Sequence, residues 1–394
     1  MLSLGRCKKL LFLAFLFTIP LLHATTNFPY FQAITHFEQE QIDGHIINQF
    51  DRRFRYEFLD DIQRLSIFSL DAGYAYELES WVFTVEGRAT TQLFDEDYTV
   101  PYYLSNFSNE NINNVMLSVA SVDYYHDNFA FSVGRNKIDF DYLYGSVDSI
   151  MTYYGDEYIS ATAFWFLNYY DFQYNYFTKY ENINNDEGVY GLYLQSGEKL
   201  DNFIISIYNY GTRDGEYLTG FSAALEINDF VLNSSFTYAN SFLDRAFLNQ
   251  ERYNRVWIDY YHDKSIFEIG VSKTGDSDLY LMLVFGSYPF SEFYLTNNIN
   301  KKEARNIYAK YSYEDANFAL NLVGGSTYFM AEQIIADKIF EVEANSYELD
   351  ARIDYYFNKH WSVDVSFSYL KNSTNASLEF DQQLVSTNVV FQWL

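Results

Sequence analysis

Cysteine and proline are scarce in this sequence, and long apolar runs are missing beyond its first residues. The one cysteine is Cys7, and only 4 prolines occur among 394 residues. A chain with a single cysteine has no disulfide framework and no multi-thiolate metal site. The mean hydropathy is −0.23, and no later segment reaches the roughly 20 apolar residues of a transmembrane helix. The sequence therefore excludes a disulfide-stabilised domain and a helical membrane protein.

The N-terminus has the composition of a secretory signal peptide. Three cations precede an apolar segment at residues 10–22, which is too short to span a bilayer. Cleavage after Ala24 is expected, which predicts a signal peptide at residues 1–24. Its removal takes away Cys7 and the three cations but no acid, so the secreted chain is more acidic than the full sequence with its net charge of −27. Such acidity argues against nucleic acid as a partner.

Aromatic residues are far more abundant than in ordinary soluble proteins. They make up 21% of the chain, with 39 Tyr and 37 Phe. Amphipathic rings at this density are typical of the aromatic girdles of a transmembrane β-barrel. A secreted carbohydrate-binding β-protein can also be rich in aromatic residues, so composition alone leaves both classes open.

The clearest pattern lies at residues 347–369, where two strands flank a short polar turn at residues 358–360. Apolar and aromatic side chains alternate with charged or small polar ones, so one face of this hairpin is apolar and the other polar. An alternation held for about ten residues per strand suits a wall between lipid and water. It predicts an all-β fold, a transmembrane antiparallel β-barrel. The apolar positions are Tyr347, Leu349, Ala351, Ile353, Tyr355, Phe357, Trp361, Val363, Val365, Phe367 and Tyr369.

The same alternation along the chain predicts eighteen strands, with sixteen as the alternative. Residues 25–44 alternate little and are predicted to be a periplasmic lead-in, so the barrel is expected at residues 45–394. Separate strands are expected at 49–58 and 68–78, and again at 171–181 and 189–196. Short turns and long loops alternate, and the longest external loop is predicted at residues 274–305.

Charged residues with inward parity are the candidate pore lining. They include Arg53, Arg55, Arg88 and Arg352 together with Asp350 and Asp354. Opposite charges on facing walls create a transverse field that selects solutes. The alternative is that these residues only solvate a wide aqueous interior, and parity does not decide between the two.

Catalytic and metal-binding patterns are nearly absent. No GxSxG, HExxH, P-loop or GxGxxG motif occurs. Ser277 lies in a Gly-Asp-Ser sequence within a polar loop, and His126, His262 and His360 fall in predicted periplasmic turns without ligand spacing. We therefore expect no enzyme activity, no catalytic residue, no metal and no cofactor.

Several short motifs resemble those of the OprD-like (Opr-type) outer-membrane porins of Gram-negative bacteria. The segment FSVGRNKI at residues 131–138 looks like that family's "GRQxL" strand end, and an aromatic strand follows within residues 145–166. The segment GVSKTGDS at residues 270–277 and the closing hairpins also look similar. The usual prolines of the family's constriction loop are missing, and the chain ends in Leu394 rather than Phe.

The resemblance implies eighteen antiparallel strands, passive uptake of small solutes and an inward-folded constriction loop, here residues 139–160. Asp139, Asp141 and Asp148 of this loop would then face the basic wall formed by the inward arginines. We expect an outer-membrane porin that contacts lipid, small hydrophilic or charged solutes and, during insertion, the barrel-assembly machinery, as a monomer or homotrimer. The alternatives are a barrel enzyme acting on lipids and a secreted β-rich binding protein.

Overall fold

The computed structural model describes most of the chain after the predicted signal peptide. The described residues are 28–50, 53–95, 114–140, 143–170, 180–182, 188–197, 202–213, 215–241, 250–279, 300–335, 338–374 and 378–393. The predicted signal peptide and the C-terminal Leu394 lie outside them. No α-helix in these ranges is long and apolar enough to cross a membrane.

All regular structure in the described residues is β-strand. The strands are β1 (Phe28–Phe50), β2 (Arg53–Leu78), β3 (Trp81–Asp95), β4 (Asn114–His126), β5 (Phe129–Phe140), β6 (Leu143–Gly155), β7 (Ile159–Tyr170), β8 (Tyr180–Asn182), β9 (Val189–Ser196), β10 (Phe203–Thr212), β11 (Glu216–Ile227), β12 (Phe230–Ser241), β13 (Glu251–His262), β14 (Ser265–Thr274), β15 (Arg305–Glu314), β16 (Phe318–Ile335), β17 (Lys338–Tyr356), β18 (Trp361–Thr374) and β19 (Leu378–Trp393).

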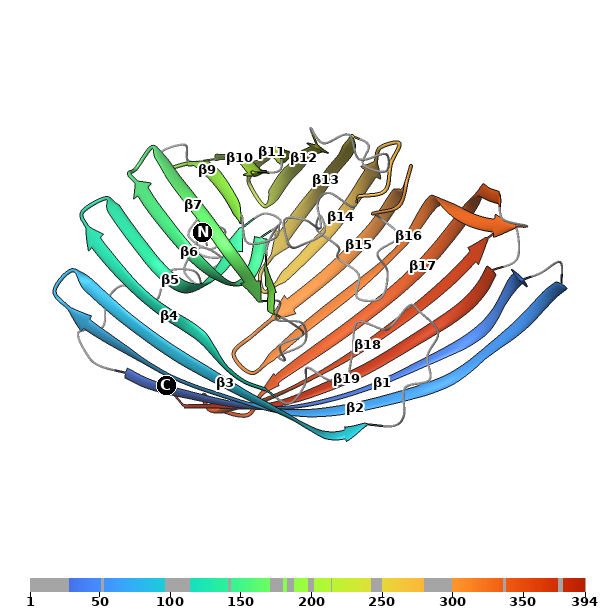
Figure 1. The fold of residues 1–394 in the computed structure, drawn as a ribbon, viewed down its shortest axis with the longest axis horizontal. Coiled ribbons are helices and arrows are strands. Elements are labelled where there is room, and N and C mark those ends of the chain that lie inside the picture. The colour runs from blue at the N-terminus through green and yellow to red at the C-terminus, as the bar shows by residue number, and fades with distance from the viewer. Residues whose placement is uncertain are drawn as a thin grey trace.

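The strands form one closed antiparallel barrel. Apart from β8 and β9, each strand pairs with its sequence neighbours, and β1 closes the ring by pairing with both β2 and β19. The short β8 and the longer β9 pair with successive parts of the same edge of β7, so they share one position and the barrel has 18 strands. The expectation of an eighteen-stranded all-β barrel is confirmed. Figure 1 shows the strands as a strongly curved, tilted wall.

Tight turns gather at one end of the barrel. Glu79, Asp127, Asn228 and Asp263 have positive φ angles between 48° and 57°, and each begins a two-residue hairpin connection. This left-handed conformation is the one that a two-residue turn needs to match the twist of its strands. β1 begins and β19 ends at this same end of the barrel, since Phe31 pairs with Trp393.

The predicted lead-in at residues 25–44 is wrong from Phe28 onward. Those residues belong to β1, which runs for 23 residues and pairs along its length with β2. The predicted strands 49–58 and 68–78 also merge, because β2 is a single strand of 26 residues. A bilayer needs only about 9–11 residues of a tilted strand, so β1 and β2 are more than twice as long as one membrane crossing requires.

The predicted constriction loop at residues 139–160 is wrong in its extent. Most of it is the strand β6, which pairs with β5 on one side and β7 on the other. The predicted total of eighteen strands is nevertheless right. The prediction missed β1 and β6, but it counted two strands where β2 lies and two strands at the single position that β8 and β9 share. Of the predicted strand 171–181, only the last two residues lie within the described chain, as part of β8.

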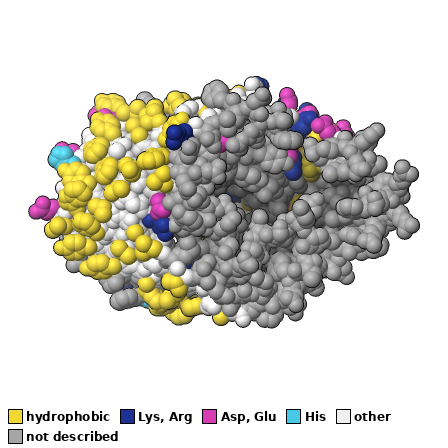
Figure 2. Space-filling view, viewed as in Figure 1, with side chains coloured by type: hydrophobic (Ala, Val, Ile, Leu, Met, Phe, Trp, Pro, Cys, Tyr) yellow, Lys and Arg dark blue, Asp and Glu magenta, His cyan; other side chains and the backbone are white. Residues whose placement is uncertain are grey.

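The outer surface of the barrel is apolar and the inner face is polar. In the hairpin of β17 and β18, Tyr347 and Leu349 are more than half exposed, whereas Glu348 and Asp350 between them are only 4% and 2% exposed. Figure 2 shows hydrophobic side chains over much of the outer surface at the turn end. The alternation read from the sequence is therefore the alternation between outside and inside.

Candidate functional site: the charged lumen and an inward hairpin

The lumen face of β2 and β3 carries a buried ion pair. Asp71 and Arg88 are directly opposite each other in the ladder. Arg88 donates from Nε and Nη2 to the two carboxylate oxygens of Asp71, and the side chains are only 8% and 4% exposed. A bidentate pair of this kind neutralises both charges on the same wall.

A second cluster surrounds Arg255 on β13. Its Nε donates to the Tyr308 hydroxyl at 2.8 Å, and its Nη2 donates to Glu268 Oε1 at 2.8 Å. The guanidinium also lies 4.3 Å from the ring centroid of Trp257 and 5.1 Å from that of Tyr308. Ring stacking and a carboxylate together compensate the burial of this cation.

A third cluster lies on β17 and β18. Arg352 donates to Asp354 Oδ1 from Nε at 3.0 Å and from Nη2 at 2.9 Å, and its Nη2 is 3.9 Å from Asp364 Oδ2. The Arg352 side chain is 40% exposed, so it reaches open lumen. Asp350, two residues before Arg352, faces the same way and is almost fully buried.

These clusters change the expected electrostatics. Arg88 and Arg352 do lie on the lumen face, but each is paired with a carboxylate on its own or the adjacent strand. The expected arrangement, a basic wall facing an acidic loop across the pore, stays a prediction, and the described contacts add that both arginines have partners on their own side of the lumen. Their role as pore lining stays a prediction, as does that of Asp350 and Asp354.

The other predicted site residues fall in different places. Arg53 and Arg55 begin β2, opposite Phe50 and Asn48 of β1, and their side chains are not among those described. The side chain of Asp139 and the whole of Asp141 also lie outside the described part.

Asp148 does not belong to an inward loop. It lies on β6 opposite Arg135, which donates to it from Nε at 2.7 Å and from Nη2 at 3.1 Å. Ser277, the serine of the Gly-Asp-Ser sequence, donates from its hydroxyl to the Gln250 carbonyl at 2.9 Å and so helps to close the base of the long loop.

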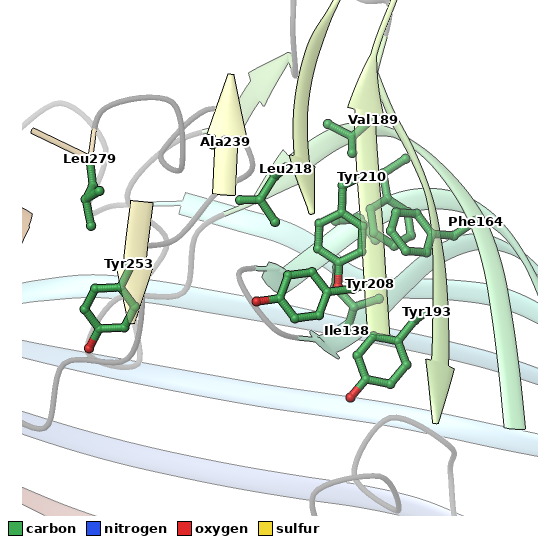
Figure 3. Packing of buried hydrophobic residues seen from close by; sticks show 12 residues of the cluster. Ile138, Phe164, Val189, Tyr193, Tyr208, Tyr210, Leu218, Ala239, Tyr253 and Leu279 are labelled. Atoms are coloured by element: carbon green, nitrogen blue, oxygen red, sulfur yellow. The ribbon is translucent and has the colours of Figure 1, made fainter. Parts of the chain in front are cut away.

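An aromatic cluster fills the lumen side of β7, β9 and β10. Phe164 and Phe166 stack with ring centroids 4.1 Å apart, and Tyr210 lies 5.3 Å from Phe164. Figure 3 shows Tyr208 and Tyr210 close to Phe164, with Val189 and Tyr193 nearby. All are at most 8% exposed. The lumen thus has an apolar side as well as a charged one.

The tip of the β5–β6 hairpin lies between these two sides. Ile138 and Val147 from the hairpin are part of the buried aromatic cluster, and Phe140 stacks on Phe164 with centroids 5.6 Å apart. On its other side, Lys137 forms an ion pair of 2.5 Å with Glu86, an inward residue of β3. The inward segment implied by the resemblance therefore exists, as a shorter hairpin tip rather than a loop of residues 139–160.

Sequence reasoning missed the aromatic lumen and the Lys137–Glu86 pair. A usable signal was present at residues 161–166, where both faces of the strand are small or apolar. A strand with an apolar lumen face must be covered from inside. The partner of Lys137 lies 51 positions away in sequence, and no local pattern predicts such a contact.

A closed antiparallel barrel with an apolar exterior, a charged lumen and an inward hairpin is the architecture of an outer-membrane porin. The chain is similar to Pseudomonas aeruginosa OpdK solved with vanillate (TM-score 0.66, 10% identity, 93% of this chain and 99% of that chain covered). It is also similar to P. aeruginosa OccK8 (OprE) (TM-score 0.63, 11% identity, 93% and 98% covered) and Acinetobacter baumannii OccAB4 (TM-score 0.60, 11% identity, 92% and 98% covered). No protein-family model and no curated protein matches the sequence. The fold is that of the OprD/Occ porins.

Proposed function

We propose that this protein is a porin of the Gram-negative outer membrane, through which small hydrophilic or charged solutes diffuse passively. The observation that carries the proposal is the opposite polarity of the two barrel faces. Ile353 and Val365 are directly paired, point outward and are 43% and 42% exposed. Their neighbours along the two strands, Asp354 and Asp364, are also paired and point inward. Lipid outside the barrel suits the outward apolar side chains, and water inside it suits the inward carboxylates.

The conducting path would follow the charged side of the lumen. The hairpin tip and the aromatic cluster occupy the side of β7, β9 and β10, so solutes would pass along β13 to β19 and β2 to β3. Asp71–Arg88 and Arg255–Glu268 are nearly neutral pairs and mainly hold the wall together. Among the three inward arginines of these clusters, Arg352, with a side chain that is 40% exposed, would be the most accessible to a passing solute.

The two alternative functions receive less support. A secreted binding module would carry polar residues on the outer face at mid-strand, where Phe221, Val256 and Ile269 are 42%, 46% and 56% exposed. A lipid-modifying barrel enzyme would present an outward serine–histidine pair. His126 and His262 instead lie beside Asp127 and Asp263, the next residue in each turn.

Planar-bilayer recording tests the proposal. Protein refolded in detergent, without residues 1–24, should insert and give stepwise, voltage-independent conductance at low potential. The same preparation should migrate faster on gels before heating than after, which reports a folded barrel. A heat-modifiable barrel that inserts and gives no conductance steps would overturn the proposal.

A further inference from the structure

The barrel wall has a seam between β4 and β5. Their ladder joins only residues 120–126 to residues 129–135. Beyond it, β4 continues to Asn114 paired with β3 alone, and β5 continues to Phe140 paired with β6 alone. No ladder pair joins these two extensions in the described backbone. Figure 1 shows β5 turning away from β4 toward the middle of the barrel.

Two backbone features open the seam. Gly134 has φ +119°, and a Cβ at this position would lie 2.1 Å from the Ala120 carbonyl oxygen. The β3–β4 register shifts between Glu86 and Gly87, which leaves Ser118 as the extra residue of a bulge. A bulge bends its strand and increases its twist, so the two strands part at this level.

An internal repeat shows that the seam is specific to this hairpin. Residues 123–137 (DYYHDNFAFSVGRNK) and 259–273 (DYYHDKSIFEIGVSK) are identical at 8 of 15 positions. Both form a hairpin with the same two-residue turn. In the second copy β13 and β14 stay paired from Tyr253 to His262, and Gly270, the counterpart of Gly134, has no positive φ.

Polar side chains take the place of the missing ladder. Arg135 Nη1 donates to the Leu117 carbonyl at 2.8 Å, and the Ser146 hydroxyl donates to the Ser118 carbonyl at 2.5 Å. The Ser118 hydroxyl in turn donates to Glu86 Oε1 at 2.8 Å. An exposed strand edge in hydrocarbon is costly, and these side-chain contacts replace some of the missing backbone hydrogen bonds at the edge of β4.

The seam has an outer end among apolar side chains. Arg135 and Asp148 have the same parity along their strands as the outward residues Val133 and Ile150. Leu117 on β4, whose carbonyl accepts from Arg135, is 45% exposed. Arg135 shares its ladder row with Ala120 and, through it, with Val85 of the outward apolar surface. A charged pair at this depth faces protein or water far more often than lipid.

The inner end of the seam opens on the lumen. Lys137 lies two residues beyond Arg135 on the same face of β5, and its side chain is 45% exposed. Across the hairpin, Ile138 and Phe140 contact the aromatic cluster. From outside to inside, the seam therefore contains a cation, two buried serines and a second cation, beside an apolar surface.

We infer that the seam is a side portal for a single-chain amphiphile with an anionic head, between the lumen and the outer leaflet. The anionic head would first take the place of Asp148 beside Arg135 and then the place of Glu86 beside Lys137. Each cation would then have a counter-ion at every stage. The chain would lie against the apolar side of the hairpin. The inference rests on the proposed function only for the position of the barrel in the outer membrane.

Locking the seam tests the portal. In protein without residues 1–24, which contains no cysteine, Ser118→Cys and Ser146→Cys are joined by a short bifunctional thiol reagent with a reducible link. The matched control joins Ser222→Cys and Ser235→Cys, which are opposite each other in the uninterrupted β11–β12 ladder. The probe is dodecanoate carrying a photoreactive diazirine in its chain, supplied from the bilayer of proteoliposomes.

Mass spectrometry after illumination reads the labelling of the hairpin residues 136–147. We expect labelling to fall at least tenfold when the seam is locked, to return on reduction, and to stay unchanged in the control. Lys137→Met should lower labelling by dodecanoate but not by the matching dodecanol probe. Equal labelling of locked and unlocked protein would overturn the portal. Conductance measured on the same samples tests the proposed function separately, because the lock leaves the axial path open.

Discussion

Asp354 and Asp364 lie directly opposite each other across the β17–β18 ladder, two carboxylates at one level of the lumen wall. Like charges in directly opposite positions of two strands destabilise the sheet. Arg352 donates to Asp354 at 2.9 Å and lies 3.9 Å from Asp364, and Asn388 donates to Asp364 at 2.8 Å. Arg352 therefore lies between the two carboxylates and offsets part of their negative charge.

Replacing Arg352 should make the channel more selective for cations. Arg352→Met removes a positive charge that lies beside both Asp354 and Asp364, so the local potential becomes more negative. The expected result is a shift of the reversal potential toward the cation equilibrium potential in a potassium chloride gradient, larger at low salt than at high salt. Arg352→Lys, which keeps the charge, should stay near wild type. An unchanged reversal potential in Arg352→Met would mean that this cluster lies away from the conducting path.

Local sequence pattern predicted this part of the barrel well. The faces of β17 and β18 were assigned correctly from period-2 alternation, because one face meets an apolar medium and the other water. The pairing of particular charges was not predictable in the same way. The register between strands brings Arg88 close to Asp71 and Arg352 close to Asp364. The residue pattern of a single strand does not encode this register.

The Asp71–Arg88 pair should matter more for stability than for selectivity. Both side chains are almost fully buried, and removal of one partner leaves a buried charge without compensation, at a cost of about 3–5 kcal/mol. Arg88→Met should therefore lower the urea midpoint of the refolded barrel, read from heat-modifiable mobility. The double variant Asp71→Leu with Arg88→Met should recover much of the loss. A double variant no more stable than Arg88→Met would show that the pair is not what Arg88 contributes.

The missed strand β6 has a physical explanation. Val147 is fully buried and Ser146 is buried beside β4, so both faces of this end of the strand are covered by protein. A strand enclosed on both faces lacks the contrast between apolar and polar sides. The inward hairpin was therefore hidden from pattern analysis by the same packing that holds it inside the lumen. Its inward course was suggested only by resemblance to a family.

Charge insertion on the two faces of β18 should have opposite consequences. Val365 is outward and 42% exposed, so Val365→Arg places a charge against lipid at a cost of about 2–4 kcal/mol and should reduce the folded, heat-modifiable fraction in outer membranes. Ser366 is inward and its hydroxyl contacts that of Ser386. Ser366→Arg should leave assembly largely intact and lower the conductance. Equal loss of assembly in both variants would mean that the faces are misassigned.

The turn that joins β15 and β16 should loosen in acid. The backbone amide of Asn317, the hydroxyl of Tyr313 and, less strongly, the backbone amide of Phe318 donate to the carboxylate of Asp315 and hold its pKa below the ordinary value of 3.8. A lowered pKa means that the turn is fully stabilised above pH 3.8 and loses this stabilisation as the pH falls through the lowered value. Hydrogen-exchange protection of the Phe318 amide, corrected for intrinsic rates, should drop between pH 5 and pH 2. Asp315→Asn keeps an acceptor without a titrating group, so its protection should not depend on pH over this range.

Gly134 should be the position where a single methyl group disturbs the inward hairpin. Its φ of +119° is strained for any side chain, and the added Cβ would lie 2.1 Å from a backbone oxygen of β4, which cannot move like a flexible side chain. Strain of this kind costs about 1–3 kcal/mol. Gly134→Ala should therefore lower the unfolding midpoint and change the conductance together, because β5 must leave the wall elsewhere.

Gly324 on β16 provides the matched control, since its Cβ would meet the nearest atom, Leu349 Cδ1, at an ordinary 3.5 Å. Gly324→Ala should leave both stability and conductance near wild type. If Gly134→Ala lost stability while its conductance stayed unchanged, the hairpin tip would lie outside the current path. The narrowest part of the lumen would then lie along the Arg352 cluster instead.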